Sequence, residues 1–257
     1  MITVNLMGRL GNNLFQIAAG LSLAHRHETD CYYINHFDYL NAFELKDIKQ
    51  TTNSCNSTFY EKTFNFNENF LKLGNNIHLH GYFQSYKYFL NAEEKIKSNF
   101  TFKQFVKDNV WKNGYSYLEQ ENNVTAIHVR RTDYLSVQHV HPICSMEYYT
   151  DSLLRIGKTD KVLVFSDDVV WCRQNFDLNY EIVDMDLHCS MYMMSKVKNI
   201  IIANSTFSWW SAWLNNTPNK QVYAPKQWFG NTLPYKNADI NLETCTKDLF
   251  LPEWNVL

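Results

Sequence analysis

The 257-residue sequence lacks the features that define several classes of protein. Its six cysteines are scattered and none forms a C-x-x-C pair, so neither a zinc site nor a disulfide framework is indicated. No window approaches about 20 apolar residues, so we expect no membrane-spanning helix, and Met1–Leu6 does not have the pattern of a signal peptide. An excess of one charge is also missing, because 24 basic side chains oppose 26 acidic ones. This balance argues against general binding to nucleic acid or membrane surfaces.

The sequence does contain enough apolar material for a sizeable core. Hydrophobic residues make up 45% of the chain and charged residues 19%, which is not the composition of a disordered protein. Aromatic residues reach 16%, and we expect most of them, including the tryptophans of residues 209–213, to pack in the core. A chain of this length forms one large domain or two small domains that share a cleft.

The hydrophobic pattern predicts an α/β fold. Ile2–Met7 is a short apolar run before a glycine-containing loop, and apolar residues then recur at helical spacing, which is how a Rossmann-type unit opens. From residue 124 strands and helices alternate, which predicts βαβ units and a parallel sheet. The predicted strands are Val124–Arg130, Lys161–Ser166, Tyr180–Val183, Asn199–Ala203 and Gln221–Ala224, and the predicted helices are Met146–Ile156, Met191–Lys198 and Phe207–Leu214. Residues 28–124 show few clear elements, and a boundary within residues 108–123 gives lobes of residues 1–115 and 116–257.

The strongest chemical signal is the segment His128–Tyr134, which reads HVRRTDY. Arg130 and Arg131 follow a predicted strand, and ligands of parallel sheets bind beyond the carboxyl ends of strands. A guanidinium group matches phosphate oxygens with two parallel hydrogen bonds, so one arginine here can hold a pyrophosphate. The alternative is an ion pair with Asp133 that caps the strand. Two arginines at the end of a buried strand are costly without a partner, which favours an anion site.

A second signal is the segment Asn204–Leu214, which follows the apolar run Ile200–Ile202 directly. Small hydroxyl residues therefore stand where a strand passes into a helix, and backbone N–H groups at a helix start form a natural phosphate cradle. Ordinary N-capping by Ser205 or Thr206 is the alternative, and the two roles are compatible.

Two further segments carry weaker signals. Gly8–Gln16 places two glycines before a helix, where the backbone can approach a ligand, and its amide side chains suit sugar hydroxyls better than charges. Asp167 and Asp168 end another predicted strand, where acids can hold a divalent ion against a diphosphate. Adjacent acids on a strand project to opposite faces, however, which argues against a shared ion.

Together these segments resemble the bacterial alpha-1,2-fucosyltransferases, glycosyltransferase family 11. The resemblance rests on Gly8–Gln16, Gly81–Ser85, His128–Tyr134, Phe165–Asp168 and Asn204–Leu214, whose order and spacing run through nearly the whole chain. The His-x-Arg-Arg-x-Asp element is shared with alpha-1,6-fucosyltransferases and protein O-fucosyltransferases, whereas Asn-Ser-Thr-Phe-Ser-Trp-Trp is more specific to the alpha-1,2 branch. The resemblance implies two Rossmann-like lobes in a GT-B-type architecture, with GDP bound mostly by the C-terminal lobe and the acceptor by the N-terminal lobe.

The resemblance also implies roles for individual residues. The catalytic set is Arg130, which grips the β-phosphate, with Arg131 and Asp133. The donor-binding set is His128 near the guanine, Arg130, Asn204, Ser205, Thr206, Phe207, Ser208, Asp186, Gly11, Asn12, Asn13 and Gln16. The acceptor-binding set is Asp38, Tyr82, Gln84 and His139. No metal ligand is expected.

Two departures from related families leave two roles open. Alpha-1,6 relatives carry a glutamate where this chain has Gln138, and alpha-1,2 members commonly carry an acid where this chain has Ser190. The candidates for the guanine-reading acid are Asp184 and Asp186, and the candidates for the base are Asp133, Asp38 and His139.

We therefore expect a cytoplasmic enzyme that moves fucose from GDP-fucose to the 2-hydroxyl of a galactose, with inversion and without a metal or cofactor. The expected partners are GDP-fucose and a galactose-containing glycan, with no nucleic acid and at most a peripheral association with the inner face of a membrane. Three alternatives stay open: a metal-dependent nucleotide-sugar transferase that uses Asp167 or Asp168, a glycan-binding protein without catalysis, and an inactive protein that keeps the fold.

Overall fold

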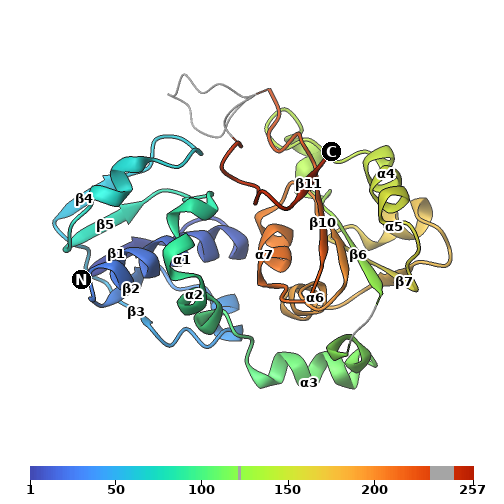
Figure 1. Ribbon diagram of the computed structural model, residues 1–257, viewed down its shortest axis with the longest axis horizontal. Helices are drawn as coiled ribbons and strands as arrows, with labels where there is room; N and C mark the ends of the chain where they lie inside the picture. Colours follow the sequence, from blue (N-terminus) through green and yellow to red (C-terminus); the bar gives the residue numbers. More distant parts are fainter. Residues whose placement is uncertain (121–122, 232–245) are drawn as a thin grey trace. The chain divides into compact units, whose positions relative to one another are not determined.

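The computed structural model describes residues 1–120, 123–231 and 246–257, and these form two compact units, each built on a parallel β-sheet (Figure 1). The first unit comprises residues 1–103 and 246–251, and the second comprises residues 104–231 and 252–257. The α/β class and the parallel sheets predicted from the sequence are confirmed. No helix in the described part of the chain is both long and apolar enough to cross a membrane.

The first unit is a five-stranded sheet with the order β3-β2-β1-β5-β4, and all of its pairings are parallel. Its strands are β1 (Ile2–Asn5), β2 (Cys31–Ile34), β3 (Ile48–Gln50), β4 (Ser57–Tyr60) and β5 (Ile77–His80), and its α-helices are α1 (Leu10–Arg26) and α2 (Glu93–Asn99). Short 3-10 helices occupy Asp38–Ala42, Glu68–Lys72, Tyr86–Tyr88 and Leu90–Ala92.

Helix α1 packs closely on the strands that flank it in sequence. A β-carbon added at Gly20 would stand 2.3 Å from Cγ2 of Val4 in β1 and 3.0 Å from Sγ of Cys31 in β2. Real β-carbons do not approach other atoms this closely, so the glycine permits the observed distance between helix and sheet. The segment Gly8–Gln16 follows β1 closely and contains the first turn of α1.

The second unit is a six-stranded parallel sheet with the order β11-β10-β9-β6-β7-β8. Its strands are β6 (Val124–Val129), β7 (Lys161–Ser166), β8 (Glu181–Val183), β9 (Asn199–Ile201), β10 (Gln221–Ala224) and β11 (Asn255–Val256). Its α-helices are α3 (Gln104–Lys112), α4 (Met146–Ile156), α5 (Val169–Asn175), α6 (Leu187–Met194) and α7 (Thr206–Leu214), and 3-10 helices occupy Ser116–Glu119 and Asp133–Ser136. All six residues of β6 are buried, as expected for a central strand of a parallel sheet covered on both faces.

Strand order reverses beside β6. The chain runs outward from β6 to β7 and β8, and then returns to β9 on the other side of β6 before running outward again to β10 and β11. This is the doubly wound order, in which a crevice opens at the carboxyl ends of the two strands that flank the reversal. In the first sheet the chain runs outward from β1 to β2 and β3, then crosses to the edge strand β4 and returns inward to β5 beside β1.

Most predicted elements of the second unit are confirmed. The helix Met146–Ile156 and the strands Lys161–Ser166 and Gln221–Ala224 have the predicted bounds. The predicted helix Met191–Lys198 is wrong at both ends, because α6 spans Leu187–Met194. It starts earlier because the Asp186 carboxylate accepts hydrogen bonds from the backbone N–H groups of His188 and Cys189. Trp209, Trp210 and Trp213 are buried, as predicted, and the five cysteines in the described residues are free, while Cys245 lies outside them.

The division of the chain falls earlier than the predicted lobes of residues 1–115 and 116–257. Helix α3 packs on α6 and belongs to the second compact unit, which starts at Gln104. The physical reason is that α3 buries Val106 and Val110, an apolar pair at helical spacing that the sequence analysis did not use.

Candidate functional site

The candidate site lies at the carboxyl ends of β6 and β9, which flank the strand reversal of the second sheet. Strand β6 ends at Val129 and passes directly into Arg130 and Arg131, while β9 is followed by Asn204 and Ser205. Tyr134 joins the two ends, because its hydroxyl donates a 3.1 Å hydrogen bond to the carbonyl oxygen of Asn204. The two strongest signals in the sequence are therefore neighbours at the place where this fold binds ligands.

The Arg130 guanidinium is mostly buried and contacts two carboxylates. Its Nη2 lies 2.6 Å from Oδ1 of Asp133, and its Nη1 lies 3.1 Å from Oδ2 of Asp167. The ring of Tyr134 lies beneath the group, with its centroid 5.4 Å from the Arg130 Cζ atom. Arg130, and not the second arginine Arg131, therefore makes the ion pair with Asp133. The anion site at Arg130 stays a prediction.

Arg131 has a different environment. Its Nε lies 3.3 Å from Oδ2 of Asp168, and its guanidinium stacks on Trp171 with 3.9 Å between Cζ and the ring centroid. Asp168 also accepts a hydrogen bond from the backbone N–H of Trp171 and caps the start of α5. These contacts give Arg131 a structural role, because they tie the end of β6 to α5. The catalytic role assigned to Arg131 from the sequence stays a prediction.

Asp167 organises the loop that carries both arginines. Its carboxylate accepts hydrogen bonds from the backbone N–H groups of Arg131 at 2.9 Å and Thr132 at 3.2 Å, and from the Thr132 hydroxyl. Burial raises the pKa of Asp167, but the Thr132 hydrogen bond and the charge of Arg130 outweigh burial and hold the pKa below its usual value. From the sequence, Asp167 was a candidate metal ligand only, although its place at a neighbouring strand end was the signal for this role.

His128 is uncharged, unlike the nearby Arg130 and Asp167. It is 5% exposed, and burial together with the nearby charge of Arg130 lowers its pKa to about 3. Its ring lies 5.4 Å from that of Phe207, and its buried Nδ1 has no hydrogen-bond partner among the described residues. The imidazole is therefore uncharged at neutral pH.

The turn of residues 204–208 is fixed by side-chain hydrogen bonds. The Asn204 amide donates to the carbonyl oxygens of Pro142 at 2.8 Å and Trp228 at 3.1 Å, and the Ser208 hydroxyl donates to the carbonyl oxygen of Ala203. Ser205 takes the N-cap position of α7 but makes no capping hydrogen bond with its side chain. The first turn of α7, which begins at Thr206, therefore presents backbone N–H groups of the kind that bind anions.

In the first unit the predicted polar residues bind one another. The Asn13 amide donates to the Met7 carbonyl oxygen at 2.9 Å, and the Gln16 amide donates to those of Met7 and Gly81, both at 3.2 Å. Asn13 and Gln16 are completely buried, and Gly11 is buried as well. These contacts join the carboxyl ends of β1 and β5, so the side chains shape the loop, and direct donor contact stays a prediction.

The remaining predicted residues are dispersed. In the first unit the Gln84 amide donates to Oδ1 of Asn12 at 3.0 Å, Tyr82 is half-buried, and Asp38 is fully exposed. In the second unit His139 is exposed, and Asp186 serves as the N-cap of α6 and accepts a 3.3 Å hydrogen bond from Asn109 of α3. Burial raises the pKa of Asp186, but hydrogen bonds from Cys189 and His188 outweigh it, so the pKa lies below its usual value.

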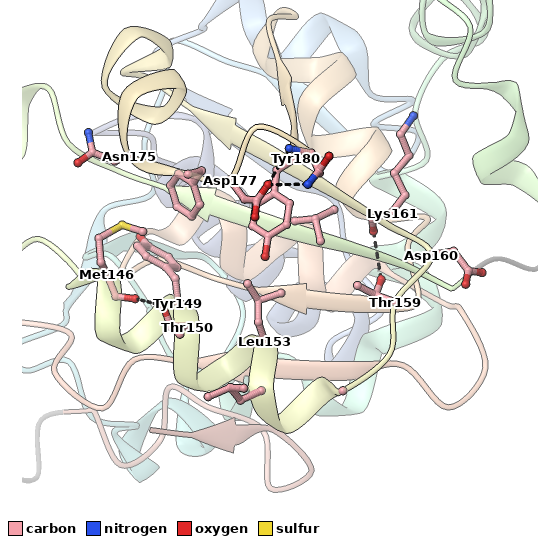
Figure 2. Close-up of a pocket in the computed structure, with 15 residues that line it drawn as sticks. Met146, Tyr149, Thr150, Leu153, Thr159, Asp160, Lys161, Asn175, Asp177 and Tyr180 are labelled. Atoms are coloured by element: carbon pink, nitrogen blue, oxygen red, sulfur yellow. Dashed lines mark hydrogen bonds between the residues drawn. The ribbon is translucent and has the colours of Figure 1, made fainter.

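A pocket of about 760 Å³ lies elsewhere on the second unit, between α4, the start of β7 and the loop that leads to β8. Figure 2 shows Met146, Tyr149 and Leu153 of α4 facing it, with Asp177 and Tyr180 on another side. None of the predicted site residues lines this pocket. It lies near the amino end of β7, whereas the candidate site lies at the carboxyl ends of the strands.

Comparison with known proteins identifies the family. The family model described as glycosyl transferase family 11 matches residues 1–257. The chain belongs to this family. The resemblance noted from the sequence is thereby confirmed.

Curated relatives from Escherichia coli agree with this assignment. The chain is 41% identical to the O-antigen biosynthesis glycosyltransferase WbnK over 120 residues, which cover 42% of this chain and 39% of WbnK. It is 34% identical to an alpha-1,2-colitosyltransferase over 163 residues, which cover 58% of this chain and 55% of the relative. The chain thus matches less than two thirds of the length of either relative.

Solved structures support the fold. The NodZ alpha-1,6-fucosyltransferase soaked with GDP-fucose has a TM-score of 0.55 at 11% identity, covering 83% of this chain and 92% of NodZ. POFUT1 in complex with GDP-fucose has a TM-score of 0.53 at 12% identity, covering 87% and 96%. The predicted architecture of two Rossmann-like lobes of GT-B type is confirmed by these neighbours.

Proposed function

We propose that the protein transfers L-fucose from GDP-β-L-fucose to the 2-hydroxyl of a galactose in a glycan, with inversion and without a metal ion. Membership of family 11 supports the transfer of a sugar, and the names of the relatives and structural neighbours favour fucose or a closely related sugar. The observation that carries the proposal is Arg130 at the strand reversal, in a segment whose Tyr134 hydroxyl donates a hydrogen bond to the Asn204 carbonyl oxygen just before α7. A guanidinium and a helix start are two anion-binding groups that suit one diphosphate.

In the proposed mechanism the acceptor hydroxyl attacks the anomeric carbon from the face opposite the diphosphate. The new carbon–oxygen bond forms as the bond to the phosphate oxygen breaks, and the electron pair leaves with GDP. Arg130 and the backbone N–H groups at the start of α7 stabilise the negative charge that grows on the diphosphate. The hydroxyl proton passes to a base, for which Asp133 is the candidate that contacts Arg130.

Colitose transfer is the second candidate function. It is favoured by the relative named alpha-1,2-colitosyltransferase, which aligns with 58% of this chain. The two candidates differ in the donor sugar and not in the phosphate-binding group, so Arg130 serves both. Turnover of GDP-fucose in direct competition with a colitose nucleotide separates them.

The test is turnover of GDP-fucose with lactose in excess EDTA, compared among the wild type, Arg130→Ala and the control Arg155→Ala. Arg155 is an exposed arginine of α4, so its removal makes the same change of charge away from the site. We expect wild-type turnover in chelator, a loss of about 100-fold or more in R130A, and little change in R155A. NMR of the product reports the linkage and the anomeric configuration.

Two outcomes would contradict the proposal. Loss of wild-type activity in EDTA would favour the metal-dependent alternative through Asp167 or Asp168. Failure of the wild type to bind GDP at all would remove the fucosyl donor from consideration.

A further inference from the structure

The two carboxylates that contact Arg130 are held very differently. Asp167 has a side chain that is 19% exposed, and it accepts three hydrogen bonds from Arg131 and Thr132 in addition to its contact with Arg130. Asp133 has a side chain that is 42% exposed and stands at the start of the 3-10 helix Asp133–Ser136. The first carboxylate is part of the loop's framework, whereas the second approaches the guanidinium from a more accessible position.

The carboxylates of Asp133 and Asp167 already balance the positive charge of Arg130, so a bound diphosphate would add a third anion at the same guanidinium. Arg131 is matched by Asp168, and His128 is neutral, so Arg130 is the positive side chain that the paired carboxylates share. Adding a diphosphate to Arg130 while Asp133 and Asp167 stay in place would bring several negative charges around one guanidinium. Like charges this close in a partly buried site repel strongly. Movement of one carboxylate away from Arg130 would relieve this repulsion.

On the basis of the proposed function, we propose that Asp133 occupies one arm of the Arg130 guanidinium, its Nη2 atom, before the donor binds. The donor's diphosphate then displaces Asp133 and takes its place on that arm. Asp167 stays bound to the other arm as a positioning residue. A phosphate can replace the carboxylate on Nη2 with the same kind of charge-assisted hydrogen bond. Asp133 is the one that moves because its side chain is the more exposed, whereas displacing Asp167 would break the hydrogen bonds that shape the loop.

The exchange has two consequences for the reaction. Before donor binding, Asp133 pairs with Nη2 of a mostly buried cation whose Nη1 already contacts Asp167, so both sides of the guanidinium have a partner. After transfer, the return of Asp133 to Arg130 competes with GDP and favours its release. The same side chain therefore weakens the binding of the nucleotide and helps to empty the site.

The prediction is that removing each carboxylate changes GDP affinity in opposite directions. Asp133→Asn removes the competitor, so the dissociation constant for GDP should fall by about fivefold. Asp167→Asn loosens the loop and the orientation of Arg130, so the dissociation constant should rise by about tenfold or more. Asp160→Asn is the control, because it removes an exposed carboxylate of the same unit away from the arginines, and its affinity should stay close to that of the wild type.

The measurement is calorimetric titration of each full-length variant with GDP and with guanosine, which lacks the diphosphate. Competition for Arg130 predicts that D133N strengthens GDP binding without strengthening guanosine binding. Equal strengthening of both ligands, or unchanged or weaker GDP binding in D133N, would overturn the proposal while leaving fucosyl transfer standing. Absence of GDP binding in the wild type would instead contradict the proposed function itself.

A second variant tests the positioning role if D167N does not fold. Thr132→Val keeps the shape of the side chain and removes the hydroxyl that donates to Asp167. Weaker GDP binding in T132V, with a circular dichroism spectrum like that of the wild type, supports the role of Asp167. Unchanged affinity in T132V would contradict it.

Discussion

At the scale of single residues, the adjacent arginines Arg130 and Arg131 make different contacts. Arg131 stacks on Trp171 and pairs with Asp168, so its removal deletes a desolvated cation–π contact and leaves a carboxylate without its partner. We expect Arg131→Ala to lower the free energy of unfolding by about 2 kcal/mol, with little change in GDP affinity. Urea unfolding and GDP titration measure the two effects, with Arg155→Ala as the control. An R131A variant of normal stability that fails to bind GDP would show that Arg131 contacts the donor.

The sequence predicted which strand ends carry charged side chains, but not which arginine pairs with which aspartate. The arginines of residues 130 and 131 and the aspartates of residues 167 and 168 were each recognised as strand-end groups. Strand alternation does not apply to the two aspartates, because both lie beyond Ser166, the last residue of β7. Both contact the arginine loop, Asp167 through Arg130 and Asp168 through Arg131, and Asp168 also caps α5. Which arginine each aspartate meets depends on the register of β6 against β7, a contact between segments 36 residues apart or more, which local patterns do not contain.

At the scale of elements, the second unit was the more predictable. Its strands β6, β7 and β9 are buried, largely apolar runs separated by helices, and such runs are marked by hydrophobicity alone. Residues 28–103 gave few predictions because β3 and β4 are short and largely exposed and the connections include several 3-10 helices. In that region tertiary contacts, such as the pairing of β4 with β5, determine the structure more than local preference does.

Gly20 provides a test of how α1 packs on the first sheet. Alanine favours helix formation over glycine by up to about 1 kcal/mol, yet its β-carbon would stand 2.3 Å from Cγ2 of Val4. We expect the clash to dominate, so that Gly20→Ala lowers the free energy of unfolding by about 1–3 kcal/mol in urea. Gly74→Ala is the control, because a β-carbon there meets nothing within 4 Å. A G20A variant as stable as the wild type would mean that the helix can shift away from β1 at no cost.

At the scale of the whole molecule, each unit has its own parallel sheet and its own buried residues, so a ligand of one unit should stabilise that unit first. GDP at 100 times its dissociation constant adds about 2.7 kcal/mol to the stability of the state that binds it. Some backbone amides of β6 exchange their hydrogen with solvent only when the second unit unfolds. If the donor binds this unit, the hydrogen-exchange rates of those amides should fall by about 100-fold. Amides of β1 should change much less, and Arg130→Ala should abolish the difference.

Hydrogen exchange of the full chain, followed by mass spectrometry with and without GDP, measures both units in one sample. Protection confined to the second unit would agree with a donor held by Arg130 and the start of α7, with Asn13 and Gln16 shaping the first unit's loop. Equal slowing in β1 and β6 would contradict that expectation, because GDP would then either contact both units or stabilise a chain that unfolds as one. Peptides covering residues 8–16 distinguish these two cases, since direct contact protects the loop at early exchange times, whereas shared unfolding slows only the late-exchanging core.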